Sequence, residues 1–272
     1  MRHHGTCAEL VGIGPHDHIG WVYSGPDEFP ALARDFLATG AAAGERLMYV
    51  AEDPNASRLE GMDHLIDSGV LTVASIAEVY GASGVVHAAH QRTVFLQALA
   101  EAQAEGYEAI RVAADNTPLL SNDERFRAWL RWEMVADQLM SKQPVIGLCA
   151  FDRERVDIDR LRNTATLHPL LSSSSPVPQF RLYSDEGELR AEGDLDTYAV
   201  QRITWALPHL PFDTGVIIDL AVTTFLSSAV MQALYKIAQT GIRVTIRGTA
   251  EATRALRQGI SSHHPHLSFV VS

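Results

Sequence analysis

The chain has 272 residues and a mass of 29.8 kDa, which is enough for one large domain or two modest ones. Hydrophobic residues make up 46% and charged residues 20%, a balance typical of a globular protein that argues against intrinsic disorder. The formal net charge is −11, of which −10 belongs to residues 1–175. Because such an acidic chain lacks the positive face that a phosphate backbone requires, the sequence argues against direct nucleic-acid binding and against anionic membrane surfaces.

The lack of an apolar signal or membrane segment and the low cysteine content predict a cytoplasmic protein. No apolar run reaches the roughly 18 residues of a membrane span, and the N-terminus leads into no apolar signal core. The two cysteines, Cys7 and Cys149, are too few for a disulfide framework and lie in no CxxC zinc motif. We therefore expect a reducing compartment and no membrane partner.

Strand-like and helix-like patterns alternate through about the first 170 residues. Apolar runs predict strands and apolar residues at helical spacing predict helices, in the order strand 21–24, helix 27–40, strand 47–51, helix 61–68, strand 71–73, helix 86–105, strand 109–113, helix 126–142 and strand 145–150. Alternation of this kind favours a mainly parallel sheet with helices on both faces.

A serine run followed by two prolines divides the chain at residues 172–178. Small polar residues favour a linker, and proline can neither continue a helix nor join a central strand. The sequence thus predicts an N-terminal domain over residues 1–171, a linker over 172–178 and a second domain over 179–272.

The second domain has a shorter pattern of the same kind. The predicted elements are a hairpin of strands 180–183 and 188–192 around a turn at 184–187, helix 198–207, strand 215–219, helix 228–239, strand 243–246, helix 250–258 and strand 267–271. This order predicts a small α/β domain.

Phosphate-binding and serine-hydrolase motifs are absent. A Walker A loop needs a Gly-Lys pair, and neither of the two lysines, Lys142 and Lys236, follows a glycine. After the first strand, the carboxylates of Asp27 and Glu28 would repel a triphosphate at the helix N-terminus. No GxSxG nucleophile elbow occurs either, so ordinary NTP hydrolysis and serine-hydrolase chemistry have no support.

Histidine, cysteine and aspartate supply the candidate site of the first domain. His18 precedes the first strand, Cys149 ends a later one and His168 closes the domain, so converging strand ends predict a ligand pocket or a borderline-soft metal site. Tyr23 and Asp115, each near the carboxyl end of a strand, are assigned to the same pocket. The alternative is that Cys149 is a small buried hydrophobe and the other groups are caps or surface residues.

Several separated motifs in the first domain carry a family resemblance: HIGWVY at 18–23, GERLMYV at 44–50, LCAFDR at 148–153 and LHP at 167–169. They resemble the MEDS domain, the "methanogen/methylotroph, DcmR sensory" domain, over about residues 8–171. The resemblance implies a RecA/KaiC-like fold without a working phosphate loop, and sensing of a small molecule or partner, including hydrocarbon-derived signals, in place of catalysis. It also makes His18, Cys149 and His168 the pocket candidates.

The second domain carries GDLD at 193–196 and VIIDLAVTTFLSS at 216–228. These segments resemble the STAS domain of anti-sigma factor antagonists, over roughly residues 179–272. The resemblance implies that Ser228, with Ser227 beside it, is a phosphorylation switch that ejects the partner, and that the partner-binding surface contains Asp194, Asp196, Thr224, Phe225 and Val230. The family usually has Asp and Gly where this chain has Ser227 and Val230. The alternative is that both serines are helix caps and nothing more.

These observations favour a non-enzymatic two-domain regulator of transcription. In this hypothesis a sensor domain biases an antagonist domain that binds an anti-sigma factor or a GHKL-type serine kinase, and no cofactor is predicted. The second hypothesis is a metal- or small-ligand-dependent enzyme that uses His18, Asp115, Cys149 and His168. A third is a structural module that forms a homodimer through either domain.

Overall fold

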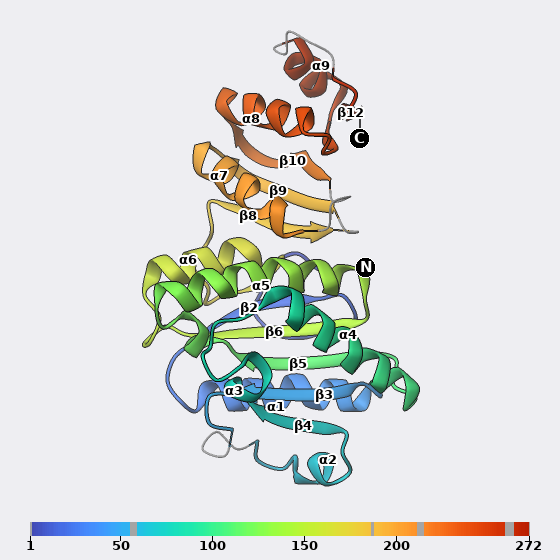
Figure 1. Cartoon of the computed structure of the whole chain (residues 1–272), viewed down its shortest axis with the longest axis vertical. Coiled ribbons are helices and arrows are strands. Elements are labelled where there is room, and N and C mark those ends of the chain that lie inside the picture. Colours follow the sequence, from blue (N-terminus) through green and yellow to red (C-terminus); the bar gives the residue numbers. More distant parts are fainter. Residues whose placement is uncertain (1, 55–58, 186–187, 211–214, 259–263, 272) are drawn as a thin grey trace. The chain divides into compact units, whose positions relative to one another are not determined.

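The computed structural model describes residues 2–54, 59–185, 188–210, 215–258 and 264–271 (Figure 1). The chain divides into two compact units, Met1–Val177 and Pro178–Ser272. Each unit is an α/β domain with its own sheet, as the sequence predicts. Within the part of the chain that the structure describes, none of the helices combines the length and the apolar character needed to cross a bilayer.

The first unit is built on a seven-stranded sheet in which every neighbouring pair of strands is parallel, so the prediction of a mainly parallel sheet is confirmed. The strand order is β1-β7-β2-β6-β5-β3-β4. The strands are β1 (Gly5–Cys7), β2 (His18–Tyr23), β3 (Arg46–Ala51), β4 (Leu71–Ser75), β5 (Ile110–Asp115), β6 (Val145–Asp152) and β7 (Leu170–Ser172).

Helices cover both faces of this sheet. They are α1 (Glu28–Ala42), α2 (Asp63–Asp67), α3 (Ile76–Tyr80), α4 (Ala88–Ala104), α5 (Asp123–Lys142) and α6 (Ile158–Leu167), with a 3₁₀ turn at Thr117–Leu120. Helix α1 packs against β3 and β5, whereas α5 packs against β6 and contacts both α4 and α6 (Figure 1). A parallel sheet buried on both faces explains why most side chains of its strands are apolar.

The two-residue period of β2 decides which side chains meet which helices. Ile19 and Tyr23 belong to the core that contains Phe29 and Phe36 of α1. His18 and Gly20 alternate with them and therefore face the opposite layer, where α5 and α6 lie. The sheet thus separates residues that are neighbours in the sequence.

Strands β7 and β1 and helix α6 have no counterpart among the predicted elements. Ser172, the first residue of the predicted linker, ends β7, and its hydroxyl lies 2.8 Å from the hydroxyls of both Ser174 and Ser175. The Ser174 hydroxyl in turn donates a hydrogen bond to the carbonyl of Val22 in β2. The serine run is therefore tied to the sheet by hydrogen bonds that a composition argument does not reveal.

The neighbouring strands β2 and β6 lead the chain into helices on opposite faces of the sheet. From β2 it crosses to β3 through α1, whereas from β6 it crosses back over β2 to reach β7 through α6. The two connections leave the sheet on opposite faces, which opens a crevice at the carboxyl ends of β2 and β6.

The second unit has a five-stranded mixed sheet in the order β12-β11-β10-β9-β8. Its elements are β8 (Phe180–Asp185), β9 (Glu188–Leu195), α7 (Thr197–Ala206), a 3₁₀ turn at Leu207–His209, β10 (Val216–Leu226), α8 (Ser228–Gln239), β11 (Val244–Gly248), α9 (Ala250–Gln258) and β12 (Leu267–Val271). Strands β8 and β9 pair antiparallel, as predicted, and residues 186 and 187 of the predicted turn lie outside the described residues. Beyond Asp219, β10 continues beside β9 after a shift in register.

Candidate functional site

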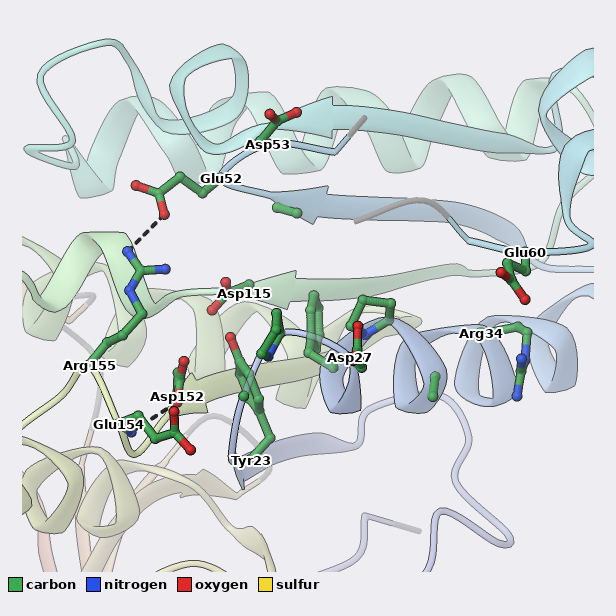
Figure 2. A pocket seen from close by; sticks show the side chains of 16 residues that line it. Tyr23, Asp27, Arg34, Glu52, Asp53, Glu60, Asp115, Asp152, Glu154 and Arg155 are labelled. Carbon is green, nitrogen blue, oxygen red and sulfur yellow. Dashed lines mark hydrogen bonds and ion pairs between the residues drawn. The ribbon is translucent and has the colours of Figure 1, made fainter. Parts of the chain in front are cut away.

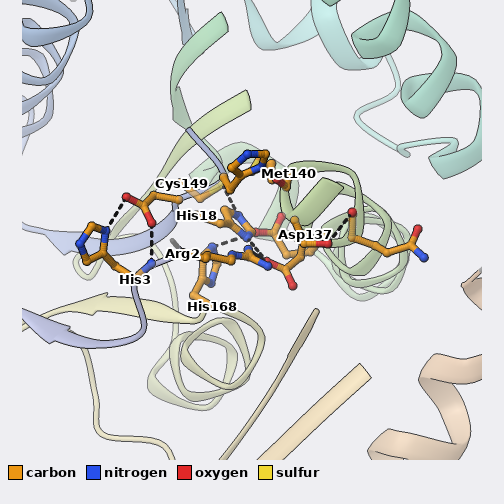
Figure 3. Close-up of polar contacts among 12 residues, drawn as sticks. Arg2, His3, His18, Asp137, Met140, Cys149 and His168 are labelled. Carbon is orange, nitrogen blue, oxygen red and sulfur yellow. Dashed lines mark hydrogen bonds and ion pairs between the residues drawn. The ribbon is translucent and has the colours of Figure 1, made fainter. Parts of the chain in front are cut away.

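A cluster of four potential ligand groups lies buried between the sheet and the layer of α5 and α6. It consists of His18 in β2, Glu133 in α5, Cys149 in β6 and His168 directly after α6. One ligand atom from each residue lies within 4.8 Å of all the others, and none of the four residues is more than 8% exposed. Figure 3 shows the side chains of His18, Cys149 and His168 pointing toward one another.

The register of β2 and β6 brings His18 and Cys149 together. His18 pairs with Gly147 and Gly20 pairs with Cys149, so the two reactive side chains point to the same face, two residues apart along the strands. The sequence argument grouped these residues because strand ends converge. They meet for a different reason. His18 is the first residue of β2 and Cys149 lies inside β6, and the register between these two strands places both side chains on the same face.

Glycine at position 20 makes room for His168. A Cβ on Gly20 would lie 2.8 Å from Cγ of His168 and 3.0 Å from its Nδ1, closer than side chains approach in folded proteins. The imidazole of His168 therefore rests directly on the backbone of β2. This close approach places its Nε2 2.8 Å from Oε1 of Glu133.

Both imidazoles direct the same ring nitrogen at the centre of the cluster. Nδ1 of His168 lies 2.8 Å from the carbonyl oxygen of Thr164, and Nδ1 of His18 lies 2.9 Å from Oδ1 of Asp137. Because these oxygens accept hydrogen bonds, each Nδ1 carries the hydrogen. The Nε2 atoms are left to face Glu133, at 2.9 Å for His18, and Nε2 of His18 also lies 3.4 Å from Sγ of Cys149.

The polar atoms at the centre are close together but are not satisfied by hydrogen bonds. Neither carboxylate oxygen of Glu133 has a hydrogen-bond partner in the structure, and neither does Nε2 of His168, although all three atoms are fully buried. Buried polar atoms in native proteins are nearly always paired, and here the pairing is by charge: Nε2 of each histidine lies at ion-pair distance from Oε1 of Glu133 without good hydrogen-bond geometry.

Electrostatic attraction between the imidazoles and the Glu133 carboxylate holds the cluster together. Burial lowers the pKa of both imidazoles, and the nearby His18 lowers that of His168 further. Glu133 and Cys149, joined by Asp137 for His18, outweigh these effects, so that the pKa of His168 is raised to about 9 and that of His18 lies well above its ordinary value. Burial alone would raise the pKa of Glu133, whereas the adjacent His168 and His18 hold it far below its usual range. The interior thus favours cationic groups beside this carboxylate.

A second candidate site opens at the carboxyl ends of the strands, where the connections from β2 and β6 leave the sheet on opposite faces. It is a cavity of about 810 Å³ (Figure 2), lined by Tyr23, Gly25, Pro26, Asp27, Phe29, Pro30, Ala31, Arg34, Ala51, Glu52, Asp53, Glu60, Asp115, Asp152, Glu154 and Arg155. Seven carboxylates against two guanidinium groups make the lining acidic. It occupies the place where doubly wound sheets bind ligands, and its charge disfavours a phosphate.

Tyr23 and Asp115 belong to this cavity and not to the histidine cluster. Asp115 accepts a hydrogen bond from the backbone N–H of Thr117 at 3.1 Å. Burial raises the pKa of Asp115, and burial together with the nearby Asp115 carboxylate raises the pKa of Tyr23 above its ordinary range. The five residues that the sequence assigned to one pocket therefore divide into two groups, on opposite faces of the sheet.

Glu133 and Asp137 were missed by the sequence argument. They lie four residues apart on α5, on the helix face that carries Trp129 and Ala136, and both are buried. Asp137 also forms an ion pair with Arg2 (Figure 3). The sequence signal for these residues was two carboxylates at helical spacing within an apolar helix face. Carboxylates on such a face are buried, and a buried charge requires a partner.

In the second unit the two serines have different positions. The side chain of Ser227 caps α8 by accepting a hydrogen bond from the backbone N–H of Val230 at 3.3 Å, whereas Ser228 is the first residue of the helix and is exposed. Thr224 and Phe225 are exposed just before it, with Phe225 at 53%. The side chain of Val230, assigned by the sequence to partner binding, is fully buried and packs in the core, so it is no part of an exposed surface.

Two aspartates of the same predicted surface have structural roles. Asp196 caps α7 by accepting hydrogen bonds from the N–H groups of Tyr198 and Ala199 at 2.8 and 3.1 Å. Asp194 accepts a hydrogen bond from the hydroxyl of Thr224, which fixes the end of β10 against β9. These contacts position the loop before α8.

The first unit is a parallel α/β domain with a cavity at the carboxyl ends of its strands and a buried cluster of His, Cys and Glu side chains. Over residues 17–169, more than half of the chain, it matches the family model "MEthanogen/methylotroph, DcmR Sensory domain". The chain belongs to this MEDS family, which points to a role in signalling. No curated protein matches the chain.

Proposed function

We propose that this protein is a non-enzymatic signalling regulator whose MEDS unit senses a small molecule and whose second unit acts as an anti-sigma factor antagonist. Membership of a sensory family supports the first half of the proposal. The mixed α/β sheet of the second unit, with an exposed serine at the start of α8, supports the second half. The partner in this proposal is an anti-sigma factor or a GHKL-type serine kinase.

The observation that carries the antagonist half is the position of Ser228. Its side chain is exposed at the N-terminus of α8, and the capping bond is already supplied by Ser227. A phosphate on Ser228 would be stabilised by the helix N-terminus while adding nearly two negative charges beside the exposed Phe225. A partner docked over Phe225 would meet this added charge and be released.

The cavity at the carboxyl ends of the strands is the site that we assign to the sensed molecule. Its volume suits a small ligand, and its seven carboxylates favour a cationic molecule or one rich in hydrogen-bond donors. This assignment leaves the buried histidine cluster out of the sensing step.

The test is capture from host lysate with three baits, followed by mass spectrometry. The baits are the parent protein, Ser228→Glu and the matched control Thr197→Glu, which adds the same charge to the first residue of α7. We expect a protein with a GHKL-type kinase domain on the parent and on Thr197→Glu, and at least tenfold less on Ser228→Glu. Equal capture by all three baits would remove the serine switch, and capture of no such kinase or anti-sigma factor by any bait would refute the antagonist function.

A further inference from the structure

We propose that His18, Glu133, Cys149 and His168 bind one zinc(II) ion in the interior of the first unit. The inference is independent of the antagonist function, because every ligand lies in the sensory unit and the test measures the metal directly. Four groups of the types that zinc prefers, imidazole, thiolate and carboxylate, converge on one point from four separate elements.

The spacing of the ligand atoms suits a single ion. In a tetrahedral zinc site with bonds of about 2.0–2.3 Å, the ligand atoms lie roughly 3.3–3.7 Å from one another. Here Oε1 of Glu133 lies 2.9 and 2.8 Å from the Nε2 atoms of His18 and His168, and Sγ of Cys149 lies 3.4 Å from Nε2 of His18. All four ligand atoms lie within 4.8 Å of one another, so on binding an ion the short contacts of Glu133 would lengthen and the longest separations would shorten, each by about one ångström or less.

The hydrogen-bond acceptors that hold the two histidine ligands have the arrangement found in metal sites. A histidine that binds a metal through one ring nitrogen donates its other N–H to a carboxylate or a carbonyl, which fixes the tautomer and the orientation of the ring. Asp137 plays this part for His18 at 2.9 Å and the carbonyl of Thr164 plays it for His168 at 2.8 Å. Both rings therefore direct their Nε2 atoms at the same point.

Charge and unsatisfied atoms favour an ion over a purely hydrogen-bonded cluster. A zinc ion with one thiolate, one carboxylate and two neutral imidazoles is neutral overall, which lowers the cost of burial in the interior. The ion would replace the protons on the Nε2 atoms of both imidazoles and would coordinate Glu133, whose carboxylate oxygens make no hydrogen bond of good geometry in the structure. Because all four positions are filled by protein, the ion has a structural role, and it ties α5 and the end of α6 to the sheet.

Metal content and cobalt(II) spectroscopy test the site. The full chain, purified without chelator, is measured for zinc by elemental analysis, and the metal-free protein is then titrated with cobalt(II). We expect about one zinc per chain, and with cobalt the visible bands of a tetrahedral ion together with a thiolate charge-transfer band. The Cys149→Ser variant is expected to lose the charge-transfer band, whereas the control Cys7→Ser keeps it, because Cys7 is the other cysteine and lies outside the cluster.

Zinc-edge X-ray absorption on the unaltered protein keeps the proposal falsifiable if Cys149→Ser does not fold. One sulfur at about 2.3 Å with three nitrogen or oxygen ligands at about 2.0–2.1 Å would support the site. A folded parent protein that holds less than a tenth of an equivalent of zinc and gives no cobalt spectrum would overturn it. Retention of the full charge-transfer band by a folded Cys149→Ser variant would overturn it as well.

Discussion

The imidazole of His168 fills the space next to Gly20 that the side chain of any other residue at position 20 would need. A Cβ at this position would lie 2.8 Å from Cγ of His168, so β2 and the residue after α6 fit together only through this glycine. The contact fixes one of the four groups of the buried cluster and makes the stability of the first unit sensitive to a single methyl group.

Gly20→Ala should therefore destabilise the protein. Overpacking a buried contact typically costs about 1–3 kcal/mol, and we expect a loss of unfolding free energy in that range by urea denaturation. Gly14→Ala is the matched control, because a Cβ there meets nothing within 4 Å, and it should change stability by less than about 0.5 kcal/mol. Equal stability of both variants and the parent would show that His168 does not rest on β2.

The buried ion pair of Arg111 and Glu45 should tolerate the loss of both partners better than the loss of one. Arg111 is 1% exposed, pairs with Glu45 and donates a further hydrogen bond to the carbonyl of Ile13 at 3.0 Å. Arg111→Met leaves a buried carboxylate unpaired, which should cost about 3–5 kcal/mol in urea denaturation. The double variant with Glu45→Leu should recover at least half of that loss.

An exposed ion pair provides the comparison for that experiment. Arg162 and Asp159 lie 3.1 Å apart on the surface of α6, where solvent screens the pair. Arg162→Met should change the unfolding free energy by less than about 0.5 kcal/mol. If Arg111→Met had an equally small effect, the buried pair would contribute nothing specific to the fold.

Asp115→Asn should make the protein more stable at neutral pH and remove part of its pH dependence. Burial raises the pKa of this carboxyl in the folded state, so its ionisation costs stability as the pH rises above the unfolded value of about 4 and through the raised folded value. Below that window the carboxyl is protonated in both states and the penalty vanishes. The asparagine keeps the oxygen that accepts from the N–H of Thr117.

Urea denaturation of both proteins across a series of pH values measures this difference. The stability advantage of Asp115→Asn should grow from acidic to neutral pH and then level off. A constant difference over the whole series would show that Asp115 titrates in the folded protein as it does in the unfolded chain. An advantage that shrinks with rising pH would mean that the ionised carboxylate is stabilised in the cavity by a cationic partner.

Ser227 and Ser228 should differ in their effect on α8. Ser227→Ala removes the cap on the N–H of Val230 and should cost about 0.5–2 kcal/mol of local stability, whereas Ser228→Ala should have almost no effect. Hydrogen-exchange mass spectrometry over the peptide 228–239 measures the difference as faster exchange. Equal protection in both variants would assign the cap to neither serine.

Much of the fold follows from local pattern in the sequence. The apolar run at 145–150 and the helical spacing at 228–239 correspond to β6 and to α8, the latter with identical bounds, because a short apolar run suits a buried strand and apolar residues at helical spacing suit a helix. Strands β1 and β7 escaped prediction because three-residue strands have no readable period. They join the sheet through distant parallel neighbours, β7 beside β2 and β1 beside β7.

The sequence by itself determined which reactive side chains the first unit contains, and it singled out His18, Cys149 and His168 together. Only the tertiary structure decided that these three meet while Tyr23 and Asp115 face the other side of the sheet, and that Glu133 of α5 completes the cluster. The physical reason is that successive side chains of a strand point to opposite faces, so that the register between strands and the helix packed on each face select which residues meet. Register depends on contacts between distant segments, and no local pattern encodes it.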